Sequence, residues 1–76
     1  MDYTPTREAA DKVAAAILRS GRSKASVAQA AGIPHTTFTR KINGDTEFTF
    51  GELLRIAEVL EIAPSNLTPS AFMAVA

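Results

Sequence analysis

Helix-breaking residues divide the chain into short segments, and this division constrains the fold more than any other feature. Gly21, the Gly32-Ile33-Pro34 step, the Asn43-Gly44-Asp45 step and Pro64 each predict the end of a helix. Between these breaks apolar residues recur at spacings of three and four, and no segment alternates with the two-residue period of a strand. The sequence therefore predicts an all-α fold, a compact bundle of four to five short helices.

The first predicted helix begins at Thr4 or Thr6 and stops at Gly21. Its expected apolar stripe consists of Ala10, Val13, Ala14, Ile17 and Leu18. A second helix, capped by Ser23, is expected over residues 24–31, and a third over residues 34–43 with Phe38 and Ile42 one turn apart.

The fourth predicted helix has the clearest boundary. Thr49 and Glu52 form a capping-box pattern, and Phe48 precedes the cap in position to pack on Leu53. The stripe then continues through Ile56, Ala57 and Leu60 at helical spacing. One more short turn should follow Pro64. We expect a single domain over residues 1–76, whose apolar C-terminal tail, residues 68–76, packs on the core or meets a second chain.

Charge order and residue types narrow the function. The 76-residue chain has 8 basic and 8 acidic residues, yet no acid lies between Asp11 and Asp45. Phosphates respond to such a local basic stretch rather than to net charge. One histidine and no cysteine, with no glycine-rich phosphate loop, predict no enzyme, metal or cofactor. Without a signal peptide or an apolar run of about 20 residues, we expect a cytoplasmic, nucleoid-associated protein.

Residues 24–43 have the arrangement of two helices joined by a sharp turn. Small Ala28 allows the helices to cross closely, Gly32 supplies the positive φ of the turn, and Ile33 fills the corner. The segments KASVAQAAGIPHTTFTRKING (24–44) and FGELLRIAEVLEIAPSNL (50–67) resemble the Cro and phage-repressor (Xre-like) helix-turn-helix family over about residues 6–68. The resemblance implies a lambda-repressor-like fold and DNA binding.

On a helical wheel, Phe38 and Ile42 lie outside an arc of about 140° that is shared by five polar residues of the third helix: His35, Thr36, Thr39, Arg40 and Asn43. Geometry and resemblance together assign base reading to His35, Thr36, Thr39 and Arg40. They assign phosphate contacts to Arg22, Lys24, Thr37, Lys41 and Asn43.

The sequence thus predicts a sequence-specific transcriptional regulator of double-stranded DNA, a repressor of the phage-immunity or Cro-like kind. Its expected partners are a DNA operator and a second copy joined through the C-terminal tail over two half-sites. The alternative is an antitoxin or protein-interaction adaptor on the same fold.

Overall fold

The computed structural model describes residues 4–69, which form four α-helices, one short 3-10 helix and no strand. The elements are α1 (Pro5–Ser20), α2 (Lys24–Ala30), α3 (His35–Ile42), α4 (Phe50–Leu60) and η1 (Pro64–Asn66). The predicted all-α bundle of short helices is confirmed. None of the helices in this range is long and apolar enough to span a membrane.

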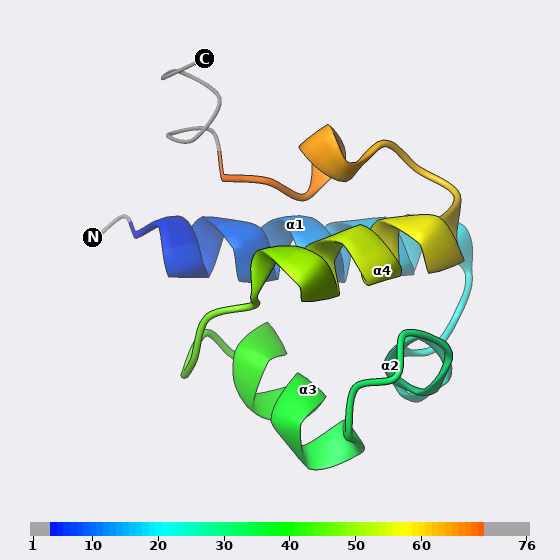
Figure 1. The fold of residues 1–76 in the computed structure, drawn as a ribbon, viewed down its shortest axis with the longest axis horizontal. Helices are drawn as coiled ribbons and strands as arrows, with labels where there is room; N and C mark the ends of the chain where they lie inside the picture. The colour runs from blue at the N-terminus through cyan, green and yellow to red at the C-terminus, as the bar shows by residue number, and fades with distance from the viewer. Residues whose placement is uncertain (1–3, 70–76) are drawn as a thin grey trace.

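The two longer helices, α1 and α4, support the two shorter ones, α2 and α3. In Figure 1, α1 and α4 run side by side across the molecule, with α2 and α3 on one side of them and η1 on the other. Helix α3 packs against α1, and α2 packs against both α4 and α3. The two short helices are therefore fixed from behind by the two longer ones.

The ends of α1 are set by its caps. Thr4 Oγ1 accepts a hydrogen bond from the Arg7 amide at 3.0 Å, and Gly21 adopts a left-handed φ of 76°. The predicted end of the first helix at Gly21 is confirmed. Of the two predicted starts, Thr4 and Thr6, the structure has the cap at Thr4. The placement of Leu18 in the apolar stripe is wrong, because this side chain is 83% exposed. Leu18 lies about 100° further round the helix than Ile17, beyond the edge of the buried face.

The turn between α2 and α3 has the predicted geometry. Ser23 Oγ accepts from the Ser26 amide at 3.0 Å and so begins α2. Gly32 has a φ of 74°, which residues with a side chain rarely adopt. The Ile33 amide then donates to Ala28 O at 2.9 Å, and both of these side chains are buried. The roles predicted for Ala28, Gly32 and Ile33 in the turn are confirmed.

The start of α4 is joined to α3 through the core. The capping box is present: Thr49 Oγ1 accepts from the Glu52 amide at 3.1 Å, and Glu52 Oε1 accepts from the Thr49 amide at 2.8 Å. Phe48 is buried and meets Phe38 edge-on, with ring centroids 5.8 Å apart. An edge-to-face pair of this kind holds α3 against the loop that leads into α4.

The C-terminal tail is described only as far as Pro69, which is buried. The Lys12 ammonium donates to Thr68 O at 2.8 Å, which ties this end of the described chain to α1. The expected contacts of the tail with the core or a second chain fall on residues 70–76, outside the described residues.

Candidate nucleic-acid interface

One side of α3 is embedded in the core. Phe38 is fully buried and Ile42 nearly so, as the spacing of these residues predicted. The turn that leads into α3 is also held from behind, because Arg55 Nε donates to Ala31 O at 2.8 Å. The position of α3 is therefore fixed before any ligand is present.

The opposite side of α3 is exposed. The five polar residues of the predicted arc, His35, Thr36, Thr39, Arg40 and Asn43, are all exposed to solvent. Their side chains make no hydrogen bond or ion pair with other residues in the range 4–69. The structure thus brings these side chains together as unpaired donors and acceptors on one surface. Their contact with bases stays a prediction.

Thr37 and Lys41 differ from the rest of the predicted set, because both are half-buried at the rear edge of α3. The Lys41 ammonium pairs with Glu52 Oε1 on α4, at a distance of 2.5 Å, and the two side chains are only 12% and 13% exposed. An ammonium held in this way has little freedom to reach a phosphate. The structure instead gives Lys41 a contact that joins α3 to α4.

Glu52 accepts one hydrogen bond from α3 and one from the residue that caps its own helix, α4. Its Oε1 takes the Lys41 ammonium and the Thr49 amide. Burial alone would raise the pKa of the Glu52 carboxyl, but the hydrogen bonds from Lys41 and Thr49 and the charge of Lys41 outweigh it and lower the pKa. Glu52 is therefore a stable carboxylate that serves as helix cap and as counter-ion.

The basic stretch seen in the sequence is partly neutralised in the fold. Lys12 is 3.1 Å from Glu8, and Lys41 is paired with Glu52. Five cations have no acidic partner within residues 4–69, and of these Arg55 donates to Ala31 O whereas the side chains of the other four make no hydrogen bond in this range: Arg19, Arg22, Lys24, Arg40 and Arg55. Arg22 and Lys24 are exposed at the start of α2, as the predicted phosphate contacts require. In the same range no group of side chains could hold a metal ion.

Arg7 is a cation near α3 that the sequence reasoning did not consider. A Cβ built on Gly44 would lie 2.9 Å from Arg7 Cζ, so the guanidinium rests against this glycine at the carboxyl end of α3. Gly44 also has a φ of 83° and is needed for the turn itself. No local motif marks Arg7, because the contact joins the first turn of α1 to a distant loop.

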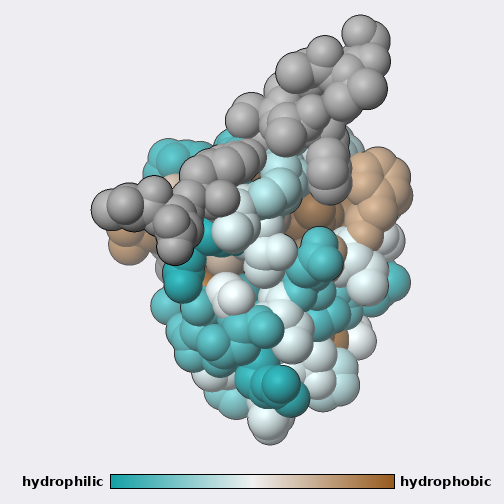
Figure 2. Space-filling view, turned by 90° about the vertical axis from the view of Figure 1, so that its left-hand side faces the viewer, coloured by the Kyte–Doolittle hydropathy of each residue, from teal (hydrophilic) through white to brown (hydrophobic). Residues whose placement is uncertain are grey.

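The hydropathy of the molecular surface agrees with the division of α3 into a buried and an exposed side. Figure 2 turns the left side of Figure 1 toward the viewer, and hydrophilic residues cover most of the lower part of that face. Figure 1 places α3 in this lower part. The larger hydrophobic areas lie higher, toward α1 and α4.

Comparison with known proteins agrees with the geometry. Residues 15–68 match the sequence model of a family described as the Cro/C1-type HTH DNA-binding domain. The matched range contains α2, the turn, α3, α4 and η1 entire, together with residues 15–20 of α1. No curated protein and no solved structure gives a significant match to the chain.

Proposed function

Because the chain belongs to the Cro/C1-type helix-turn-helix DNA-binding family, we propose that it recognises a specific duplex sequence by placing α3 in the major groove. One observation carries the proposal: a helix fixed along one side presents five unpaired polar side chains on the other. A major groove admits an α-helix, and its base edges offer the hydrogen-bonding partners that these side chains lack.

Base reading is proposed for the exposed arc, with a distinct chemistry for each residue type. Arg40 can donate two hydrogen bonds to the O6 and N7 acceptors of a guanine. Thr36 and Thr39 are short enough to allow close approach, and each offers a methyl group to thymine or a hydroxyl to another base edge. His35 opens the helix and can donate to an acceptor in the groove.

Phosphate contacts are proposed for Arg22, Lys24, Thr37 and Asn43, which lie at the start of α2 and along the edge and end of α3. Arg22 and Lys24 carry most of the expected salt dependence, because each neutralised phosphate releases counter-ions. Lys41 is left out of this set, since Glu52 already occupies its ammonium.

We propose that the domain acts as a repressor, of the phage-immunity or Cro-like kind, by occupying an operator. Within residues 4–69 only four cations have side chains with neither a hydrogen bond nor an ion pair, so a single copy has a small electrostatic contribution to affinity. Two copies on paired half-sites would double the contacts, so we propose that the operator is bound by a dimer. Analytical ultracentrifugation with operator DNA tests the stoichiometry, and a single copy per operator would contradict the dimer.

Selection from random duplex DNA at low salt tests the proposed function. We expect enrichment of one short sequence, with at least one guanine whose replacement weakens binding by Arg40-containing protein but not by the Arg40→Ala variant. The matched control is Arg19→Ala, which removes an exposed cation outside the helix-turn-helix. If no sequence is enriched, the alternative of a protein-interaction adaptor or antitoxin replaces the proposal.

A further inference from the structure

The Arg7 guanidinium lies in a place that its own helix does not explain. Arg7 belongs to the first turn of α1, where a cation is disfavoured by the positive end of the helix dipole. Its neighbour Asp11 is 4.0 Å away, and the two side chains are 54% and 69% exposed. An exposed pair at this distance contributes little to stability. Neither the dipole of α1 nor this ion pair therefore accounts for the position of the guanidinium.

The guanidinium rests instead against the carboxyl end of α3. A Cβ at Gly44 would lie 2.9 Å from Arg7 Cζ and Nη2, so the close approach depends on a residue without a side chain. The end of α3 does not need Arg7 as a cap, because the Gly44 amide donates to Lys41 O at 3.0 Å. The Asp45 amide likewise donates to Arg40 O at 2.9 Å. The Arg7 side chain donates no hydrogen bond within residues 4–69, so its N–H groups are available to a ligand beside α3.

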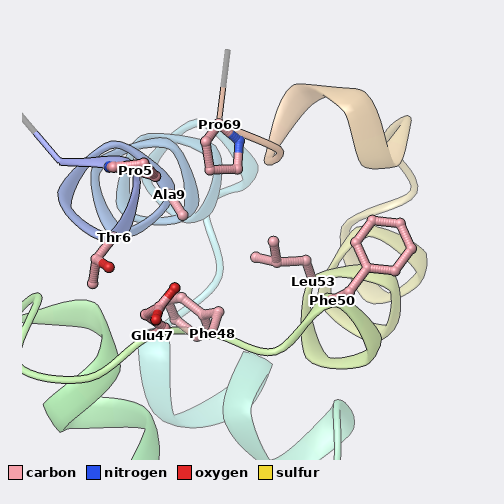
Figure 3. A pocket seen from close by; sticks show the side chains of 8 residues that line it. All are labelled: Pro5, Thr6, Ala9, Glu47, Phe48, Phe50, Leu53 and Pro69. Carbon is pink, nitrogen blue, oxygen red and sulfur yellow. The ribbon is translucent and has the colours of Figure 1, made fainter. Parts of the chain in front are cut away.

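The loop between α3 and α4 is acidic where it passes the first turn of α1. Figure 3 shows the side chain of Thr6, the residue before Arg7, directed from α1 toward Glu47 of this loop, and both residues line the same hollow. Asp45 and Glu47 are exposed, and neither is paired with a cation within residues 4–69. These carboxylates would repel a phosphate near the carboxyl end of α3 unless a cation lay beside them. Arg7 supplies such a cation.

The phosphate contacts proposed above have their cations on one side of α3. Arg22 and Lys24 lie at the start of α2, and Figure 1 places α2 to the right of α3 and the loop that follows α3 to its left, where α1 begins. At the carboxyl end of α3 the Lys41 ammonium is held by Glu52, so the proposed set leaves the neutral side chain of Asn43 there. A helix in a groove lies between two phosphate backbones, and contacts with both fix its orientation.

We propose that Arg7 binds a backbone phosphate of the duplex beside the carboxyl end of α3. A guanidinium is planar and can donate two parallel hydrogen bonds to one phosphate, and the exposed Asp11 carboxylate at 4.0 Å is too loosely held to prevent this. The contact orients α3 without reading a base. This inference rests on the proposed placement of α3 in the major groove, and it adds a residue of α1 to the DNA-binding surface.

DNA binding measured over a range of salt concentrations tests the contact. Arg7→Ala should weaken binding to matched and scrambled duplexes alike and should make the salt dependence shallower by about one unit. Arg7→Lys keeps the charge and should keep the slope. A residue that only supported the loop would change the affinity without changing the slope. An unchanged slope for Arg7→Ala would therefore overturn the proposal.

The matched control is Arg19→Ala, which removes an exposed arginine from the other end of the same helix. Its salt dependence should equal that of the unmodified protein, because Arg19 lies far from the end of α3. A slope that became shallower by the same amount in Arg19→Ala would mean that the slope follows the net charge of the protein rather than a contact of Arg7, and would overturn the proposal.

Neutral methylphosphonate groups, placed one at a time in the selected duplex, locate the contact. One replacement should weaken binding by the unmodified protein and leave binding by Arg7→Ala unchanged, because the two changes remove partners of the same interaction. This position should differ from the position that is coupled to Lys24 in the same way. Equal losses in the unmodified protein and in Arg7→Ala at every position would overturn the proposal.

Lys24→Ala separates a failure of this inference from a failure of the proposed function. If Lys24→Ala makes the salt dependence shallower and Arg7→Ala does not, DNA binding is retained and the role of Arg7 is overturned. If the unmodified protein binds no duplex at low salt, the proposed function and the role of Arg7 are both overturned.

Discussion

The two sides of α3 have opposite surroundings. On one side Phe38 and Ile42 are buried, and Lys41 is paired with Glu52 of α4. On the other side His35, Thr36, Thr39 and Arg40 are exposed and have no partner among residues 4–69. A helix of only 8 residues thus divides sharply into a part that fixes its position and a part that is available to a ligand.

This difference suggests that stability and DNA recognition are separable in α3. Substitutions on the buried side should change the free energy of unfolding, whereas those on the exposed side should change DNA binding with little effect on the fold.

Phe38→Ala should have the largest effect. Deletion of a fully buried phenylalanine side chain typically costs about 3–5 kcal/mol of stability, and Phe38 also loses its ring contact with Phe48. Urea denaturation followed by circular dichroism measures the loss. Thr36→Ala on the opposite side is the control and should change stability by no more than about 0.5 kcal/mol. Similar losses of stability in the two variants would show that the two sides of α3 do not differ in their contribution to the fold.

Arg40→Ala should weaken binding to the preferred duplex by about 1–3 kcal/mol and relax the preference at one base pair. Its unfolding midpoint should match that of the unmodified protein, because the side chain is exposed and unpaired. Fluorescence anisotropy with matched and scrambled duplexes measures the effect. An equal loss of affinity for both duplexes would mean that Arg40 contacts a phosphate rather than a base.

Lys41→Met should lower stability by about 1–2 kcal/mol, since it keeps the apolar stem but leaves the Glu52 carboxylate without its ammonium partner. The dependence of DNA affinity on salt should keep its slope, because Lys41 does not neutralise a phosphate in this account. A slope that becomes shallower by about one unit would show that Lys41 does contact a phosphate.

Lys24→Ala should have a smaller effect, below about 1 kcal/mol at moderate salt, and should weaken all duplexes alike. The expected signature is a salt dependence that becomes shallower by about one unit. Stability should not change, because Lys24 is exposed at the start of α2. An unchanged slope would contradict its assignment to a phosphate.

The pH dependence of unfolding should show the smallest effect. The hydrogen bonds from Lys41 and Thr49 in the folded state lower the pKa of Glu52 below its ordinary value, so this carboxylate stabilises the fold at any pH above the pKa of the unfolded state. Its contribution is lost as the pH falls through the lower pKa of the folded state. Glu52→Gln should make the free energy of unfolding depend less steeply on pH in this range. An equally steep dependence would contradict the stabilising role of the Glu52 carboxylate.

Local patterns in the sequence were sufficient to predict most of the fold. The capping box at Thr49 and Glu52 and the positive φ at Gly32 depend on neighbours within one turn, and the helical spacing of Phe38 and Ile42 marks the buried side of α3. Such short-range requirements can be seen in a list of residues. The exposed arc of α3 followed from the same helical periodicity.

Contacts between distant segments could not be predicted in the same way. Glu52 was recognised as a cap, but its pairing with Lys41 depends on how α4 crosses the end of α3. Arg7 against Gly44 is a similar case. Leu18 was misplaced because apolar character alone does not define the edge of a buried face. These errors concern packing between elements, which helical spacing does not specify.

In the proposed complex the exposed side of α3 contacts DNA while the buried side keeps its place in the core. Titration of isotope-labelled protein with the selected duplex, followed by NMR of side-chain and backbone groups, tests it most directly. We expect the largest shifts at residues 35, 36, 39 and 40 and at the start of α2, with intermolecular contacts from Arg40 to a base. Shifts confined to the outer face of α4, with α3 unperturbed, would contradict it.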